Sequence, residues 1–560
     1  MIKKPIVLLL LCITILPVFA ANGELYAVLE QEFDREFREF SNKDSNLYYM
    51  DYRVDVVKAY SLSAAFGYLT GDEQNEISYC TISMRYGNHE FDNTHLLKGG
   101  RRSSNTLAFV IPSNSSEGIR QTIWFNACNL FERVKSEYIQ LKNTMKAEDI
   151  SKQNDFSNEP PNVYKEPENE IPFPDGQREI WKERLIKYSR PFAESDVIIS
   201  GNAGLDYLEQ RTYFFNSEGS RIVQNKNAAM LNLIGVIKSE DGDYTPYHRN
   251  FIAESPDQLP SDSELTEAAM EVKSMLLKLN EAPLADPYAG PVIMSPMASG
   301  VFFHEIFGHR LEGHRLKDEN NGNTFKNKLN KMVLPKTFNV WFDPTQNYLS
   351  NTYLNGHYAY DDEGVKARRV DVIERGVLKT FLMNRTPAPG LPHSNGHGRA
   401  SAGQSPVARQ SNMFIESVKP LSDSKLKNKL IKECKKQKKE YGYYIKTVSG
   451  GFTNNSRYTP NVFNVTPTEV YRIYVDGRPD ELVRGVNFIG TPLAMFSEIT
   501  AAGETPGIFN GFCGAESGSV PVATIAPSLF IKKVETQRSA QTFSKPVILP
   551  SPKSAKQEQP

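Results

Sequence analysis

The amino-acid sequence predicts an α+β fold that extends over more than one domain. The chain has 560 residues, more than one ordinary domain contains, so two or three domains are expected. Long segments alternate between apolar and polar residues, as strands do, and they occur in both halves of the chain. A few other segments repeat apolar residues at every third or fourth position, which is typical of amphipathic helices.

The composition is that of an ordinary globular protein. Hydrophobic residues make up 39% of the chain and charged residues 23%. The 65 basic and 66 acidic side chains nearly cancel, which leaves a formal net charge of −1. Such a balance gives no overall field that would hold nucleic acid or an anionic membrane surface, so we expect neither as a partner.

The first 20 residues have the plan of a secretory signal peptide. Two lysines precede an apolar run from Pro5 to about Pro17, and small residues lie before a predicted cleavage point after Ala20. The run is shorter than the roughly 18 apolar residues that a membrane span needs. We therefore expect export to a bacterial periplasm or to the medium, with no membrane anchor after cleavage. Four cysteines then remain, too few for a disulfide framework: Cys80, Cys128, Cys434 and Cys513.

Residues 21–285 are expected to form an N-terminal domain of strands and helices. Ser261 and Glu264 have the spacing of a capping box and predict the start of a helix. Residues 148–177 are acidic and rich in proline, which predicts a loop. The other expected elements are a helix over 25–41, antiparallel strands between Leu47 and Leu97, a helix over 118–145, a short helix after residue 177 and strands between 195 and 255.

Residues 286–535 are expected to form a second domain, in which most segments resemble strands. A short buried strand is expected over 290–296, directly before the segment that carries the most distinctive motif. One basic helix is expected near 421–441. The residues after it return to strand-like patterns, and the polar, proline-containing tail of residues 536–560 is expected to be disordered.

The motif lies in "VFFHEIFGHRLEGH", residues 301–314, where His304 and His309 are five positions apart. Side chains five apart on a regular helix diverge by about 140°, too far for both imidazoles to reach one metal ion. A single wide turn, with a hydrogen bond from i to i+5, would realign them, and Gly308 permits such an irregularity. The pattern therefore predicts a two-histidine metal site on a bulged helix, with Glu305 placed to hold a water.

The alternative interpretation is a core helix with polar residues inside it. Such a helix would have to bury Glu305 and two histidines without a metal, which is costly. A metal site also needs a third ligand. The residues alone leave this choice open among Glu312, His314, His357, His393, His397 and Cys513.

Several longer segments resemble, in order, the landmarks of the TldD/PmbA family of metallopeptidases. They are "GPVIMSPMASGVFFHEIFGHRLEGH", "YDDEGVKARRVDVIERGVLKTFLMN", "SGGFTNNS" with "FNVTPTEVYRIYVDG", and "GFCGAESGSVPVATIAPSLFIKKV". The resemblance runs from about Gly290 to Val534. It implies two domains, an α/β domain followed by a domain of curved antiparallel sheet that carries the metal-site helix.

The resemblance also implies a function and a set of site residues. His304, His309 and Cys513 would bind one divalent metal per chain, with zinc expected and Fe²⁺ as the alternative, and Glu305 would be the catalytic base. The substrates would be unfolded or extended peptides. The assembly would be a homodimer, or a heterodimer with a PmbA-type paralogue that lacks the metal motif. The loop of residues 356–365 would contact the substrate or support the site; without the family it is an ordinary acidic turn.

The sequence departs from the family pattern in three respects. The family wording after the cysteine is closer to Cys-Gly-Lys-x-Gly-Gln, whereas this chain has Glu516 within Cys-Gly-Ala-Glu-Ser-Gly. His314 stands where an acidic residue is usual. Typical members are cytoplasmic, and this chain has a predicted export signal. The alternative function is a non-catalytic exported subunit that assists an active TldD-type peptidase; loss of a site residue would have favoured it, and all four are present.

Overall fold

The structure is a computed structural model and describes residues 22–97, 104–113, 115–145, 153–168, 173–239, 242, 244–317, 325–453, 463–489 and 492–538. The predicted signal peptide, residues 1–20, lies outside the described residues. So does the predicted tail from residue 539 onward, whereas residues 536–538 are the end of a strand. No helix in the described part of the chain is long and apolar enough to cross a membrane.

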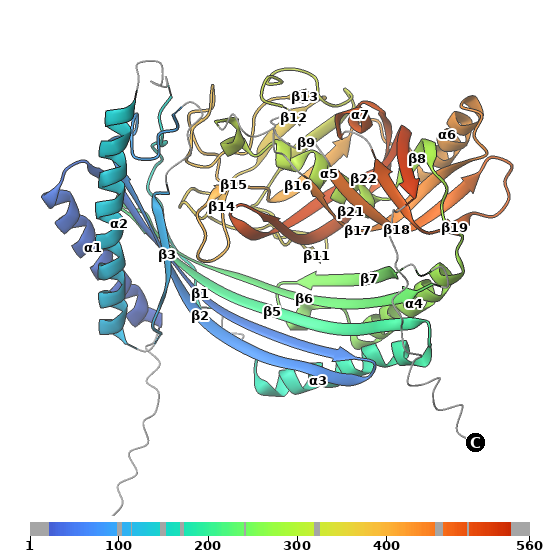
Figure 1. The fold of residues 1–560 in the computed structure, drawn as a ribbon, viewed down its shortest axis with the longest axis horizontal. Helices are drawn as coiled ribbons and strands as arrows, with labels where there is room; N and C mark the ends of the chain where they lie inside the picture. Colours follow the sequence, from blue (N-terminus) through green and yellow to red (C-terminus); the bar gives the residue numbers. More distant parts are fainter. Residues whose placement is uncertain are drawn as a thin grey trace, which may run out of the picture.

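A long, curved sheet of seven strands forms the centre of the N-terminal domain (Figure 1). Its strands are β1 (Leu47–Ala65), β2 (Tyr68–Tyr86), β3 (Thr106–Ile111), β4 (Val163–Lys165), β5 (Ile198–Asn216), β6 (Arg221–Lys238) and β7 (Tyr244–Ala253). They lie in the order β3-β2-β1-β5-β6-β4, with β7 also paired to β6. Among the described residues of this sheet, only β4 and β6 pair in parallel. The antiparallel strands predicted after Leu47 are confirmed as β1 and β2.

Four helices cover one face of this sheet: α1 (Asn22–Lys43), α2 (Ser116–Thr144), α3 (Asp175–Ser189) and α4 (Asp262–Glu281). The helices predicted over 25–41, over 118–145 and from Ser261 are confirmed as α1, α2 and α4, and the short helix predicted after residue 177 is confirmed as α3. The segment predicted as a loop, 148–177, also contains β4 and the start of α3. Along β1, even-numbered residues such as Met50, Tyr52 and Leu62 pack under the helices. The odd-numbered residues therefore face the other domain.

The C-terminal domain lies against that other face and contains an eleven-stranded sheet (Figure 1). The order is β13-β12-β9-β16-β22-β8-β17-β18-β19, and β20 and β21 also pair with β22. The strands are β8 (Tyr288–Met294), β9 (Phe338–Phe342), β12 (Val370–Glu374), β13 (Val377–Leu378), β16 (Asn412–Ser417), β17 (Tyr441–Thr453), β18 (Phe463–Tyr474), β19 (Glu481–Val483), β20 (Val486–Ile489), β21 (Ile499–Ala515) and β22 (Gly518–Arg538).

The α+β class is confirmed, but the C-terminal sheet is mixed, not antiparallel throughout. β16 runs parallel to β22, and β8 runs parallel to β17. Hydrophobic patterns do not reveal strand direction, and these partners are distant in the sequence. Two short hairpin-like pairs lie outside the sheet: β10 (Tyr348–Leu349) with β11 (Thr352–Tyr353), and β14 (Gly398–Arg399) with β15 (Val407–Ala408).

Three helices belong to this domain: α5 (Pro296–Ile306), α6 (Asp423–Lys436) and α7 (Pro492–Ser497). α5 follows the buried strand β8 and contacts β17, β21 and β22. Ser295 caps its first turn by accepting a hydrogen bond from the Ala298 amide at 3.1 Å. Every residue from Ala298 to Ile306 is buried, so the helix that carries the motif is enclosed by the domain core.

The capping box of α4 gives a local test of the fold. The Ser261 hydroxyl accepts from the Glu264 amide, and the Glu264 carboxylate accepts from the Ser261 amide at 2.8 Å. Ser261→Ala should destabilise the first turn of α4 by about 1 kcal/mol and speed amide hydrogen exchange there by about fivefold. Ser422 precedes α6 without a capping hydrogen bond from its side chain. Ser422→Ala should leave exchange in α6 unchanged; an equal effect of both substitutions would contradict the assignment.

Candidate metal centre

His304 and His309 meet because α5 ends between them. The last α-helical hydrogen bond runs from the Phe307 amide to the Phe303 carbonyl at 2.9 Å. A 3₁₀ turn, Gly308–Arg310, follows and redirects the chain. The two imidazole rings then lie with their centroids 5.2 Å apart. The predicted wide turn within one bulged helix is therefore wrong: an irregularity does bring the histidines together, but it is a helix end followed by a tighter turn.

Glycine is required at position 308 because a side chain would not fit there, not because the backbone angle is unusual. Its φ is not positive, but an added Cβ would lie 1.8 Å from Gln410 Oε1. Gln410 is completely buried, and its Nε2 donates to the His304 carbonyl at 3.3 Å. That carbonyl belongs to the last turn of α5, where backbone acceptors have no partner within the helix. The absence of a side chain at position 308 lets Gln410 satisfy it.

Cys513 reaches the same point from the far end of the domain sequence. It lies near the end of β21, which pairs with β22, and β22 pairs with β8, the strand that leads into α5. The thiol Sγ lies 3.4 Å from His309 Nε2. One ligand atom each from His304, His309 and Cys513 lie within 4.8 Å of one another, and all three residues are buried. We call these three residues the His–His–Cys group.

The chemistry of this group suits a divalent transition metal. Two imidazoles and one thiolate are a donor set that zinc accepts, and ligands about 2.0–2.3 Å from one ion lie about 3.5 Å apart at tetrahedral angles. The 3.4 Å between Sγ and Nε2 agrees with this. His304 Nδ1 is buried and has no hydrogen-bond partner among the described residues. Glu305 lies alongside, with Oε2 at 4.0 Å from His309 Nε2.

The charges within the site reinforce one another. Burial alone would raise the pKa of the Cys513 thiol, but the adjacent His304 and His309 lower it well below its usual value, so the thiolate is favoured. Burial alone would lower the pKa of His309, but Glu312 and Cys513 raise it well above its usual value. Burial raises the pKa of the Glu305 carboxyl, and the two histidines offset part of that rise.

Glu312 and Arg409 connect the two halves of the site. The Glu312 carboxylate accepts from His309 Nδ1 at 3.1 Å and from Arg315 at 3.0 Å. Arg409, which is completely buried, lies with Nε at 3.4 Å from the same carboxylate. It also donates to the Cys513 carbonyl and to Ser517 Oγ, the latter at 2.8 Å. One guanidinium therefore holds both the segment after α5 and the strand that carries the thiol.

The two positions at which this sequence departs from the family pattern contact each other. His314 Nε2 lies 2.6 Å from Glu516 Oε1, and Arg315 donates to Glu516 Oε2 at 2.8 Å. Burial would raise the pKa of Glu516, but His314 and Arg315 lower it to about 2. The pair ties the segment after the motif to the turn between β21 and β22, close to the His–His–Cys group.

The other ligand candidates lie elsewhere. His357 Nδ1 contacts the Pro344 carbonyl at 2.8 Å, and His397 is buried beside Ser411. The His393 side chain is 66% exposed. Glu312 and His314 are close to the group but are engaged by His309 and Glu516. Sequence reasoning missed Arg409 and Gln410, because two polar residues before a strand-like segment carry no periodic signal of burial.

Gly308→Ala tests the packing at the end of α5. The new methyl group would displace the buried Gln410 amide, so the substitution should lower the free energy of unfolding by about 1–3 kcal/mol. Gly176, in α3, has open space around its Cα, and Gly176→Ala should not destabilise the protein. Denaturant unfolding of both variants measures this. Adding Gln410→Ala to Gly308→Ala should recover part of the loss; strictly additive effects would contradict the clash.

Comparisons with known proteins find similarity to proteins named as metallopeptidases. Residues 287–538 match the PmbA/TldA metallopeptidase C-terminal domain. A metalloprotease from Methanothermobacter thermautotrophicus is 24% identical over 353 residues, which are 63% of this chain and 72% of that protein. A zinc metalloprotease TldD homolog from Saccharolobus solfataricus is 25% identical over 326 residues, 58% of this chain and 68% of that protein.

The fold as a whole resembles solved structures. The crystal structure of TldE from Thermococcus kodakarensis superposes with a TM-score of 0.60 at 14% identity, over 90% of this chain and 100% of that chain. At this identity the likeness concerns the fold alone. The likeness in fold extends to the N-terminal domain. The match to the C-terminal domain family covers only residues 287–538. Together the comparisons show that residues 287–538 are similar to the PmbA/TldA metallopeptidase C-terminal domain.

Proposed function

We propose that this protein is a metal-dependent peptidase that hydrolyses peptide bonds. The observation that carries the proposal is the buried His–His–Cys group with Glu305 beside it. A carboxylate next to two imidazoles and a thiolate is the arrangement of a hydrolytic metal site, in which three protein ligands leave a position open. The names of the relatives, metalloprotease and zinc metalloprotease, support the same function.

His304, His309 and Cys513 would hold one divalent metal ion, and we propose zinc. When bound, such an ion supplies a Lewis acid that makes a water more acidic and polarises the substrate carbonyl. His309 would bind through Nε2, because its Nδ1 faces the Glu312 carboxylate at 3.1 Å. That hydrogen bond fixes the tautomer and the orientation of the ring. Elemental analysis distinguishes zinc from Fe²⁺.

Glu305 would serve as the general base. Its carboxylate lies beside the ligand atoms, where it can accept a proton from the attacking water and return it to the leaving amine. Burial raises its pKa, which brings the carboxyl closer to the range in which it can both take and release a proton. Glu312 and Arg409 act through the ligands: they position His309 and Cys513 and touch no substrate.

The cellular setting of this activity is also a proposal. The substrates would be unfolded or extended peptides, since the ligand residues lie inside the domain core. The working assembly would be a homodimer or a heterodimer with a PmbA-type paralogue, as the sequence resemblance to the TldD/PmbA family implies. The sequence of residues 1–20 supports export before the protein acts.

Glu305→Gln separates the base from the metal ligands. The variant should keep its metal and lose peptide hydrolysis by about 100- to 10,000-fold, the contribution expected of a general base. Glu469→Gln is the control, because Glu469 is also buried but bonds to Tyr247, Lys446 and Tyr471, outside the site. Hydrolysis of an unstructured peptide measures both. A wild-type rate in Glu305→Gln would remove Glu305 from the mechanism.

Arg409→Met tests whether the buried guanidinium holds the two halves of the site together. Loss of such a supporting contact should weaken metal binding by about 10- to 100-fold. Arg385→Met removes a similarly buried arginine that pairs with Glu218, away from the ligands, and should leave metal affinity unchanged. The rate at which a chelator removes Co²⁺, followed by the thiolate charge-transfer band, gives the comparison. Equal loss in both variants would mean that Arg409 acts only on stability.

A further inference from the structure

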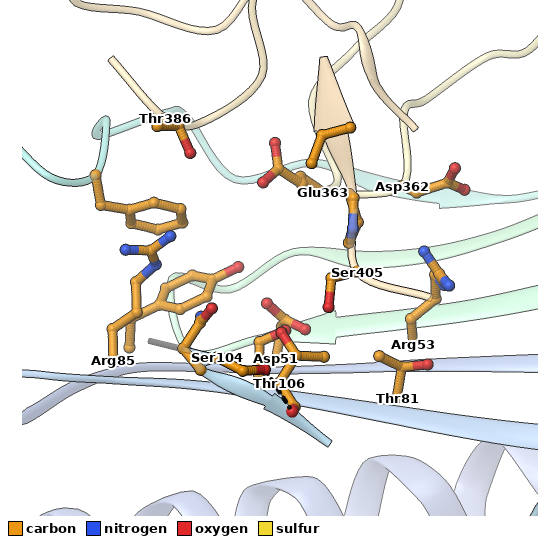
Figure 2. A pocket seen from close by; sticks show the side chains of 16 residues that line it. Asp51, Arg53, Thr81, Arg85, Ser104, Thr106, Asp362, Glu363, Thr386 and Ser405 are labelled. Carbon is orange, nitrogen blue, oxygen red and sulfur yellow. Dashed lines mark hydrogen bonds between the residues drawn. The ribbon is translucent and has the colours of Figure 1, made fainter. Parts of the chain in front are cut away.

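A cavity of about 280 Å³ lies between the two domains, apart from the His–His–Cys group. Its floor is the N-terminal sheet, with side chains from β1, β2 and β3, and its roof is formed by loops of the C-terminal domain. Figure 2 shows Asp51 on the sheet side and Glu363 on the loop side, with Arg53 and Thr81 together at one end. None of the three predicted metal ligands, nor Glu305, lines this space.

The polar floor follows from the alternation along β1. Asp51 and Arg53 are odd-numbered residues, on the face opposite the helices, and lie directly across from Ser83 and Thr81 of β2. The C-terminal domain covers this face, so the polar groups are enclosed although they belong to no apolar core. Enclosing charged groups is costly unless they meet polar partners. The charged groups in the cavity therefore need polar partners, which either other residues of the chain or a bound ligand can supply.

The acidic groups that line the cavity are not neutralised within it. Arg53 pairs with Asp55 at 3.0 Å and Arg85 with Asp92 at 2.7 Å, so both arginines already have a carboxylate outside the lining. Asp51, Asp362 and Glu363 form no ion pair with a Lys, Arg or His side chain in the part of the chain that the structure describes. Glu363 accepts a hydrogen bond from the Arg385 backbone amide at 2.7 Å. Burial raises the pKa of Asp51 to about 7 and raises that of Glu363 as well. A bound cation would stabilise both carboxylates.

Hydrogen-bond donors without partners lie at the same place. Arg53 Nη1 and Thr81 Oγ1 are buried and have no hydrogen-bond partner among the described residues. Both residues are only 2% exposed, and both line the cavity. A buried donor that is left without an acceptor destabilises the fold. A ligand with an acceptor oxygen would satisfy them while its positive group lay nearer the carboxylates.

An organic ligand fits this arrangement better than a metal ion. Among the described residues, the His–His–Cys group has ligand atoms close enough together to share one metal ion. The carboxylates of the cavity do not form such a group, so they are too far apart to bind one ion together. The cavity is also at the small end of the range of ligand pockets. Its size and its separated acidic and donor groups suit a compact molecule with an ammonium group and a nearby carbonyl oxygen.

We infer that this cavity binds the amino end of a short peptide, with the ammonium group between Asp51 and Glu363 and the first carbonyl oxygen near Arg53 and Thr81. The loop expected to contact substrate, residues 356–365, supplies Glu363 and Asp362. This inference rests on the proposed function, because the peptide would be a substrate or product of the proposed peptidase. The binding itself requires neither the metal nor hydrolysis.

Calorimetric titration with the dipeptide Ala-Ala tests the inference on the Glu305→Gln protein, which should not cleave it. Ala-Ala should bind saturably, and N-acetyl-Ala-Ala, which lacks the ammonium group, should bind at least about tenfold more weakly. Asp51→Asn and Glu363→Gln should each weaken Ala-Ala binding by a similar factor. Both amides keep an acceptor oxygen. Cys513→Ser should leave this binding unchanged, which separates a failure of the metal proposal from a failure of this one.

Three results would overturn the inference. Equal binding of the free and acetylated dipeptides would show that the ammonium group is not recognised, and this comparison needs no substitution in the cavity. If Asp51→Asn lost binding and also had a lower melting temperature, the Asp51 carboxylate would be structural. A carboxylate that serves only to bind the ligand can be replaced by the amide without lowering the stability of the protein. No saturable binding of Ala-Ala by the Glu305→Gln protein would show that the cavity does not take the amino end of a peptide.

Discussion

A helix that ends inside a protein core leaves backbone carbonyls without partners within the helix, and α5 ends in this way at Ile306. Its position is fixed by the strands around it, since β8 leads into it and β22 pairs with both β8 and β21. The buried Gln410 amide satisfies the His304 carbonyl, and it can do so only because residue 308 has no side chain. The meeting of His304 and His309 depends on this end.

The charged groups around the end of α5 are subject to the same constraint, that a buried polar group needs a partner. Two imidazoles, a thiol and a carboxylate are enclosed together, which is unfavourable unless each finds a partner. Glu312 takes one side of His309, and Arg409 joins Glu312 to the strand that carries Cys513. In the interdomain cavity, by contrast, some enclosed polar groups lack partners among the described residues. There, charged groups on the polar face of β1 are enclosed by a second domain, and some of their hydrogen-bonding capacity is unused.

Much of this structure could be predicted from the sequence, because the relevant signals are local. The capping box at Ser261 and the apolar stripe of α2 correctly predicted helices, and the alternation after Leu47 predicted strands. The proposed ligands also follow from the sequence, although the residues alone left the third one open until the family resemblance favoured Cys513. The structure places that thiol next to His309.

The features that could not be predicted depend on contacts between distant segments. Nothing near position 308 indicates that Gln410 will occupy the space beside it, so the sequence led to a wide turn where the helix ends. The parallel pairing of β8 with β17 is likewise invisible to a hydrophobic pattern. Asp51 and Glu363 lie more than 300 positions apart, and only the packing of one domain on the other brings them to one cavity.

The most direct test of the account is the metal content of residues 21–560, purified without a metal-affinity step, beside the Cys513→Ser variant. The account predicts about one metal ion per chain in the parent protein and far less in the variant, because one of three ligands is lost. No metal in either protein, even after zinc is supplied and the excess removed, would contradict the peptidase proposal. The chain would then be better explained as the non-catalytic partner of an active peptidase.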